Sequence, residues 1–191
     1  MAQQGSSDGK RLLLQQWSAR LETCNGVKLN VRPAAPEDEQ ALIEFFSKVA
    51  PEDLRFRFLS AVKKVGHDLV RQLIELDHNR TENFLAFDAE DNSLVATAML
   101  VADTDLIRAE VAIAIRSDFK HRGVGWTLLG HVSEHAAARG IKRLESIEFR
   151  DNREAITLER EMGFTASSFP GDATLVLVTK ELAPARSTEP A

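Results

Sequence analysis

Apolar residues recur at helical spacing through the first third of the chain. The pattern predicts three helices, over about residues 36–49, 51–59 and 67–77. The first two carry a proline in the opening turn, where a missing N–H leaves no hydrogen bond unmade. A further helix is predicted over about 10–23, with Trp17 and Leu21 on its apolar face. An apolar face on so short a helix must dock on its own domain or on a second subunit.

Apolar and polar residues then alternate with a period of two, as expected for half-buried strands. Val27, Leu29 and Val31 alternate with polar residues, and apolar runs of this kind return from residue 83 onward. The predicted strands lie over about 27–32, 84–87, 94–101, 108–116, 142–149, 164–168 and 173–181. Two more helices, each ended by a glycine, are predicted over 122–139 and 152–162. This order of elements predicts a mixed α/β domain rather than a doubly wound one.

The length of 191 residues suffices for one well-cored domain and is short for two. Residues 1–9 are small and polar, and the last residues carry two prolines and no core formers, so we expect disordered tails. We therefore expect an N-terminal tail with an accessory helix over 1–26, one domain over 27–182 and a tail over 183–191.

Charge and cysteine content narrow the function classes. The formal net charge of -5 argues against a general binder of nucleic acid or of an anionic membrane. Cys24 is the only cysteine, which excludes an intramolecular disulfide and fits a reducing cytoplasm. No apolar run approaches the roughly 20 residues that span a bilayer, and Gln15 and Gln16 interrupt the leucines that would suggest a secretion signal. We expect a cytoplasmic monomer or homodimer.

Two glycines lie where a predicted strand ends and the long predicted helix begins. Gly123 and Gly125 would let backbone amides approach a ligand at the helix N-terminus, whose free N–H groups and dipole favour anions. Residues 116–143 hold six Lys or Arg against two acids, within an acidic chain. By themselves the two glycines are more typical of a tight turn than of a binding loop. The local charge favours a phosphorylated ligand.

The residues around these glycines carry a resemblance to a known family. The stretch Lys120-His-Arg-Gly-Val-Gly125 resembles the Q/R-x-x-G-x-G/A pyrophosphate loop of the GNAT superfamily of N-acetyltransferases. The stretch 152–164, Asn-x-x-Ala-x-x-Leu through Met-Gly-Phe, is similar to the N-x-x-A-x-x-L-Y-x-K-x-G-F helix of the same family. The two motifs cover about residues 108–166, and the order of elements extends the match over most of 27–181.

The resemblance implies a fold and a set of binding residues. The fold would be a GNAT-like mixed sheet, flanked by helices, whose central strands splay apart to admit acetyl-CoA as co-substrate, with no metal. Backbone amides of the loop would cradle the pyrophosphate, and the end of the preceding strand would pair with the pantetheine arm. The implied acetyl-CoA-binding residues are Ile113, Ala114, Ile115, Lys120, His121, Arg122, Gly123, Val124, Gly125, Trp126 and Asn152.

Glu110 is the candidate general base. A lysine ammonium loses its proton near pH ~10.4, so transfer to the amine needs a group that accepts this proton. Alternation along the strand puts Glu110 on one face with Ala112 and Ala114, which leaves space beside the carboxylate. From this pattern alone, a solvated glutamate at the start of a strand is an equal alternative. The resemblance favours the base, because many GNAT enzymes carry a glutamate base on this strand.

The chain departs from the family pattern at two positions. Lys120 replaces the usual Gln or Arg and keeps the charge. Glu159 stands where the family commonly has a tyrosine that protonates the leaving thiolate, and the chain contains no tyrosine, so we leave the general acid unassigned. Cys24 has no base near it in sequence, and we therefore expect direct attack in a ternary complex rather than a covalent acetyl-cysteine.

The acceptor is inferred from a looser similarity. Residues 50–58 and 109–115 resemble parts of the bacterial protein lysine acetyltransferases that modify acetyl-CoA synthetase. This resemblance implies a protein acceptor, whose lysine Nε-amine is acetylated. Two alternatives stay open, which are acetylation of a small-molecule amine and a non-catalytic sensor of acyl-CoA.

The segment His131-Val-Ser-Glu134-His135 spells an inverted zinc-protease motif. On a helical wheel, His135 falls among apolar residues on the face that packs on the sheet, and Glu134 points about 100° away. No third ligand can be assigned from the sequence. We therefore expect no zinc site here.

Overall fold

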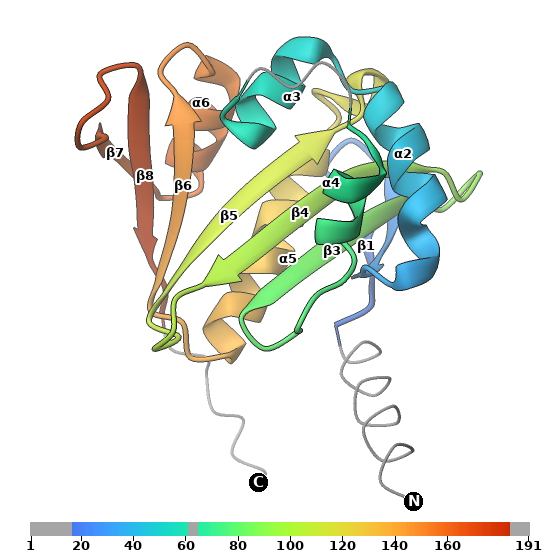
Figure 1. Ribbon diagram of the computed structural model, residues 1–191, viewed down its shortest axis with the longest axis horizontal. Coiled ribbons are helices and arrows are strands. Elements are labelled where there is room, and N and C mark those ends of the chain that lie inside the picture. The colour runs from blue at the N-terminus through green and yellow to red at the C-terminus, as the bar shows by residue number, and fades with distance from the viewer. Residues whose placement is uncertain (1–16, 61–64, 184–191) are drawn as a thin grey trace, which may run out of the picture.

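The protein is represented by a computed structural model that describes residues 17–60 and 65–183. This part of the chain forms one eight-stranded sheet with helices on both faces (Figure 1). The strands are β1 (Ala19–Glu22), β2 (Lys28–Pro33), β3 (Thr81–Asp88), β4 (Leu94–Ala102), β5 (Arg108–Ile115), β6 (Arg143–Phe149), β7 (Thr165–Ser168) and β8 (Leu175–Glu181). The helices are η1 (Pro36–Asp38), α2 (Glu39–Ser47), α3 (Pro51–Phe58), α4 (His67–Gln72), η2 (Ser117–Phe119), α5 (Val124–Ala138) and α6 (Arg153–Glu161). In the described residues, no helix is long and apolar enough to cross a membrane.

The helix predicted over 10–23 is wrong where the structure describes it. Its last residues form β1, which pairs antiparallel with β2 so that Leu21 lies opposite Leu29. The residues of β1 alternate between partly buried and exposed, and the free edge of β2 supplies their hydrogen bonds. Trp17 and Leu21 still pack against the core, as the apolar pattern indicates. Residues 10–16 lie outside the described part of the chain.

The other predicted helices and strands are confirmed, with shifted ends. The largest shift is in α4, which ends at Gln72 rather than near residue 77. Strand β2 buries Leu29 and Val31, in agreement with the period of two. The proline-led helical segment predicted over 36–49 divides into a short η1 and α2.

The sheet opens in its middle. The strands from β1 to β5 pair antiparallel along their lengths, as do β6 with β8 and β8 with β7. Between these two parts, β5 and β6 run parallel and pair only from Arg108, opposite Arg143, to Glu110, opposite Glu145. Beyond Glu110 the two strands separate. This confirms the mixed, splayed sheet expected from the sequence.

Two clusters of apolar side chains pack helices against the two faces of the sheet. One contains Phe84 and Leu128 and lies between the sheet and α5. The other contains Phe45 and Leu85 and lies under α2 and α4 on the opposite face. Each large side chain buried in this way stabilises the fold by roughly 1.5–3 kcal/mol relative to exposure. Helices are therefore packed on both faces of the sheet by apolar contacts.

Candidate active site

A cavity of about 750 Å³ lies where β5 and β6 separate. One wall is β5 with the start of α5, and the other is β6 with α6. Residues of α3 also line the cavity, and this helix lies over the gap between the ends of the two strands (Figure 1). Its lining combines apolar side chains with many charged and polar ones. A cavity of this volume is typical of a binding site for a small molecule or cofactor.

The start of α5 needs both of its glycines. Gly123 has a φ of +79°, in the left-handed region, and a Cβ added there would lie 3.0 Å from Cys24 Sγ. A Cβ on Gly125 would lie 3.1 Å from Ile115 Cδ1 and 3.2 Å from Leu158 Cδ1. Gly125 therefore lets α5 approach β5 and α6 at once. This packing requirement is a second reason for the glycine, beside the approach of amides to a ligand.

The first turn of α5 faces the cavity. Gly123, Val124, Gly125 and Trp126 line it, and the indole of Trp126 is 44% exposed. The N–H groups of a first helical turn have no partner within the helix, so they can bind an anion. Arg122 is not among the lining residues, because its guanidinium stacks over the ring of Phe119 at 4.6 Å.

Lys120 lies at the mouth of the cavity in an ion-pair cluster. Its Nζ is 3.0 Å from Asp53 of α3 and 3.3 Å from Glu154 of α6. The Nε2 of His121 lies 3.7 Å from the same Glu154. These contacts raise the pKa of Lys120, although its partial burial opposes them. The lysine thus links two helices on opposite sides of the cavity, and a phosphate would compete with two carboxylates for it.

The end of β5 supplies a free backbone edge. The side chain of Ala114 lies in the cluster under α2 and α4, whereas Ile113 and Ile115 pack against the α5 cluster. The alternation expected from the sequence is therefore present. On the side toward β6 the strand has no pairing partner after Glu110. Its N–H and C=O groups there can pair with a ligand that lies between the strands.

Glu110 lies where the strands begin to separate, with an exposed face toward the cavity. Loss of surrounding water raises the pKa of its carboxyl above the ordinary value. The guanidinium of Arg57, from α3, acts in the opposite direction, and Glu145 on β6 adds to the rise. Burial lowers the pKa of Arg57 itself to about 10. Its Nε and Nη2 have no hydrogen-bond partner among the described protein atoms.

The opposite wall carries two carboxyl groups, Glu148 on β6 and Glu159 on α6. Asn152 Nδ2 donates a hydrogen bond of 2.6 Å to Glu148 Oε2. Ser146 Oγ lies 2.5 Å from Glu159 Oε1 and 3.3 Å from Glu148 Oε1. The second oxygen of Glu159 is buried without a partner among the described protein atoms. The expected cavity residue Asn152 is thus present, but its amide is engaged with Glu148.

Both of these carboxyl groups hold protons more tightly than an ordinary glutamate. Burial raises the pKa of Glu148 to about 7, although Asn152 and Ser146 oppose the rise. Burial raises the pKa of Glu159 to about 8, and the nearby Glu148 adds to the effect. Sequence reasoning missed Glu148 and marked Glu159 only as a departure from a motif. An acid near the end of β6, four residues before Asn152, was the available signal.

The histidines of α5 belong to the core. His135 is 2% exposed, and its ring packs against Trp17 and Phe84 at centroid distances of 4.5 and 5.0 Å. Burial lowers its pKa to about 4. The Nε2 of His131 lies 3.2 Å from the carbonyl oxygen of Trp17. The expected orientation of His135 toward the sheet is confirmed. Across residues 17–60 and 65–183, no three His, Cys, Asp or Glu side chains gather in a metal-binding arrangement.

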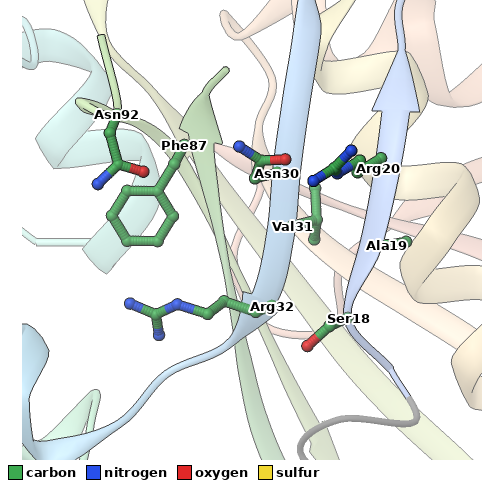
Figure 2. A pocket seen from close by; sticks show the side chains of 8 residues that line it. All are labelled: Ser18, Ala19, Arg20, Asn30, Val31, Arg32, Phe87 and Asn92. Carbon is green, nitrogen blue, oxygen red and sulfur yellow. The ribbon is translucent and has the colours of Figure 1, made fainter. Parts of the chain in front are cut away.

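A second hollow, of about 390 Å³, lies on β1, β2 and the end of β3 (Figure 2). It is lined by Ser18, Ala19, Arg20, Asn30, Val31, Arg32, Phe87 and Asn92. Arg32 donates hydrogen bonds of 2.7 and 2.6 Å to Asp38, and its guanidinium lies over the ring of Phe87. The lining contains no acid, histidine or cysteine. The chemistry of the molecule is therefore concentrated in the larger cavity.

Known proteins share this fold. The sequence profile of the acetyltransferase (GNAT) family matches residues 43–164. An acetyltransferase of Pseudomonas aeruginosa is 27% identical over 155 residues, which cover 80% of this chain and 83% of the relative. The GNAT domain of S. lividans PAT superposes with a TM-score of 0.80 at 23% identity, over 87% of this chain and 98% of that chain. The spermidine N-acetyltransferase from Vibrio cholerae, in complex with CoA and spermine, superposes with a TM-score of 0.66 at 16% identity, over 81% and 95% of the two chains.

The profile covers more than half of the chain, and the chain belongs to the acetyltransferase (GNAT) family. It is an acetyl-CoA-dependent N-acetyltransferase. The cavity fits that co-substrate, because it combines an unpaired strand edge with the N-terminus of a 15-residue helix.

Proposed function

We propose that this enzyme transfers the acetyl group of acetyl-CoA to the Nε-amine of a lysine side chain in a protein, with Glu110 as the general base. The observation that carries the proposal is the position of Glu110, at the point where β5 and β6 part and on the cavity wall. An amine that enters the cavity there meets a carboxylate with a raised pKa, which accepts a proton more readily than an ordinary glutamate.

The co-substrate would lie between the two strands. The amides of Gly123 to Trp126 would hold the pyrophosphate, and Lys120 would add charge once it exchanges its carboxylate partners for phosphate. The free edge from Ile113 to Ile115 would pair with the pantetheine arm. This arrangement would place the thioester beside Glu110, where the amine nitrogen attacks the acetyl carbon directly.

Two observations support a protein acceptor. Residues 50–58, which resemble part of the bacterial protein lysine acetyltransferases, form α3 and its start, and this helix lines the cavity. The GNAT domain of S. lividans PAT also has the same fold over most of its length. An acyl-CoA synthetase is the acceptor we would test first.

A small-molecule amine is the second candidate. Glu110 and Glu145 lie opposite each other on β5 and β6, and two neighbouring carboxylates favour a cationic amine. The fold is shared with a spermidine N-acetyltransferase. Polyamines are therefore the first small acceptors to test.

The test is release of free CoA from acetyl-CoA with a purified acyl-CoA synthetase as acceptor, with acetyl-lysine identified by mass spectrometry. We expect Glu110→Gln to lower the rate by about 10²–10⁴, because general-base catalysis contributes that much. Glu134→Gln, at an exposed position on α5 outside the cavity, is the matched control.

Transfer to the synthetase that survives Glu110→Gln would contradict the role of this residue. Transfer to spermidine but not to the synthetase would select the small-amine candidate. Binding of acetyl-CoA without transfer to any amine would contradict both and favour an acyl-CoA sensor.

A further inference from the structure

Arg57 on α3 is a buried cation whose hydrogen-bonding capacity is unused within the protein. Its Nε and Nη2 are enclosed and have no partner among the described atoms. No carboxylate of the described residues forms a hydrogen bond or an ion pair with this guanidinium. A charge that is taken out of water without a partner is costly to the folded state. An arginine of this kind on a cavity wall favours a ligand that supplies the missing partner.

The guanidinium reaches the cavity beside the proposed base. Arg57 and Glu110 both line the cavity, and each acts on the other through its charge without direct contact. Because Nε and Nη2 are enclosed, Nη1 is the nitrogen of Arg57 that is left to face the cavity. Burial lowers the pKa of Arg57 to about 10, so the guanidinium is still a cation at neutral pH. The cavity thus offers one ligand a carboxylate and, apart from it, an N–H donor.

This pair lies on the face of the sheet that α2, α3 and α4 cover (Figure 1). Leu54 of α3 is buried in the apolar cluster under α2 and α4. Ala109 and Val111, the neighbours of Glu110 on β5, pack in the cluster under α5, so the Glu110 side chain points to the other face. The helix N-terminus expected to hold the pyrophosphate belongs to α5. Arg57 is therefore on the side where an acceptor, rather than the phosphates, would contact it.

We propose that Arg57 binds a main-chain carbonyl oxygen of the acceptor polypeptide, and thereby selects the amine of a lysine residue over amines without such an oxygen. This inference rests on the acetyl transfer proposed above. The amine and the main chain of a lysine are separated by four methylene groups. The two polar contacts therefore fall at two separate points, with the amine at Glu110 and the amide oxygen at Arg57.

The chemistry of the guanidinium sets this preference. Its N–H groups donate and cannot accept, so its partner must be an acceptor oxygen, and every residue of a polypeptide carries one in its amide carbonyl. A polyamine has no oxygen, and its further ammonium groups are repelled by the positive charge of Arg57. The residue thus distinguishes the two classes of acceptor considered for this cavity.

The experiment compares two acceptors that share one alkylamine. The first is Nα-acetyl-L-lysine N-methylamide, which carries main-chain amides, and the second is 1-pentylamine, the same side chain without a main chain. The kcat/KM for each is measured at pH 9, well above the ordinary pKa of a glutamate, in wild type, Arg57→Met and Arg71→Met. Arg71 is exposed on α4 and lies outside the cavity lining, so it is the matched control.

We expect the wild type to prefer the lysine compound by about 10–100-fold, the range that one hydrogen bond to a charged group gives. Arg57→Met should lose this preference through a higher KM for the lysine compound, with little change for 1-pentylamine. Arg71→Met should keep it. A role of Arg57 in folding, or in the pKa of Glu110 alone, would change both acceptors alike, so the ratio of the two kcat/KM values isolates the proposed contact.

Folding of the variant is checked by urea unfolding. Methionine replaces an unpartnered cation with an apolar chain, so the free energy of unfolding should stay the same or rise. Arg57→Leu, a second neutral variant, should lose the preference in the same way.

An unchanged ratio in both neutral variants would overturn the inference, as would a wild type without the preference. Transfer to neither compound would also overturn it, because the proposed contact lies within a single lysine unit. In each of these cases, Glu110-dependent transfer to the synthetase would leave the proposed function standing. Loss of that transfer as well would overturn the proposed function.

Discussion

Each wall of the cavity carries a glutamate with a raised pKa, and the walls differ in the charged group that lies near this glutamate. On the β5 wall, Glu110 lies near the guanidinium of Arg57, which opposes the rise of its pKa. On the β6–α6 wall, Glu159 faces Glu148, which increases the rise. Glu110 thus has a cation near it as well as the carboxyl of Glu145, whereas the charged neighbour of Glu159 is another acid. The cation limits the rise of the first pKa, and the acid increases the rise of the second.

This difference separates the proton affinities of two carboxyl groups in one cavity. Burial acts on both walls in the same direction, so burial alone would give two similar acids. The sign of the neighbouring charge separates them. Exchanging or removing those neighbours is therefore the most direct way to test the comparison.

The largest change should follow from removing the cation of the β5 wall. Arg57→Met takes away the charge that lowers the pKa of Glu110, so this pKa rises further. A base works only above its pKa, so the acid limb of the kcat/KM profile for 1-pentylamine should move to higher pH. Activity toward this acceptor should fall most at the acidic end of the profile, with little change at pH 9. Arg57→Lys, which keeps the charge, is the control, and an unshifted profile in Arg57→Met would contradict the assignment.

A smaller effect is expected on the free energy of unfolding, and it comes from Glu159 on the β6–α6 wall. Above pH ~5 the unfolded chain ionises Glu159, whereas the native state keeps its proton up to a pKa of about 8. The native state then binds more protons, so its free energy of unfolding falls as pH rises, by up to about 1.4 kcal/mol per pH unit. Glu159→Gln should lose this contribution and show a shallower decline, because Glu148, with its pKa raised to about 7, still contributes. Urea unfolding at pH 5, 6 and 7 measures this decline. The same dependence of the free energy of unfolding on pH in variant and wild type would contradict the raised pKa of Glu159.

The smallest effect should come from Cys24, which belongs to neither wall. Its thiol is exposed and lies near Gly123, at the loop rather than beside Glu110. Cys24→Ala should leave kcat within about twofold, because no acetyl-cysteine forms during direct attack. Steady-state release of CoA is sufficient to check this. A large loss of turnover in a folded variant would point to a covalent intermediate.

Much of this architecture could be predicted from the sequence, because local patterns determine it. The alternation around Leu29 and the glycines that end α5 and α6 are signals within one element. The segment at Ala19–Glu22 could not be predicted in this way. Its apolar spacing fits a helix, and the free edge of β2, a tertiary feature, makes it a strand instead.

The candidate site was predictable only at residues that belong to a motif or to a strand pattern. Gly123 and Glu110 belong to a continuous stretch with a recognisable order, so both could be identified. The pairing of Glu148 with Glu159 joins a strand to a helix, and Arg57 reaches Glu110 from a distant segment. Proximity of this kind depends on the packing of the elements, which no local pattern records.

The exposed indole of Trp126 gives this protein an optical reporter of its own. The chain has two tryptophans and no tyrosine, so its near-ultraviolet emission comes almost entirely from two known places. Trp17 is packed against His135, far along α5 from the loop, while Trp126 lies on the first turn of that helix with 44% of its surface free. A ligand that reaches the helix N-terminus alters the surroundings of one fluorophore and leaves the other as an internal reference. Occupancy of the cavity can thus be followed in real time, with the natural chain and without any label.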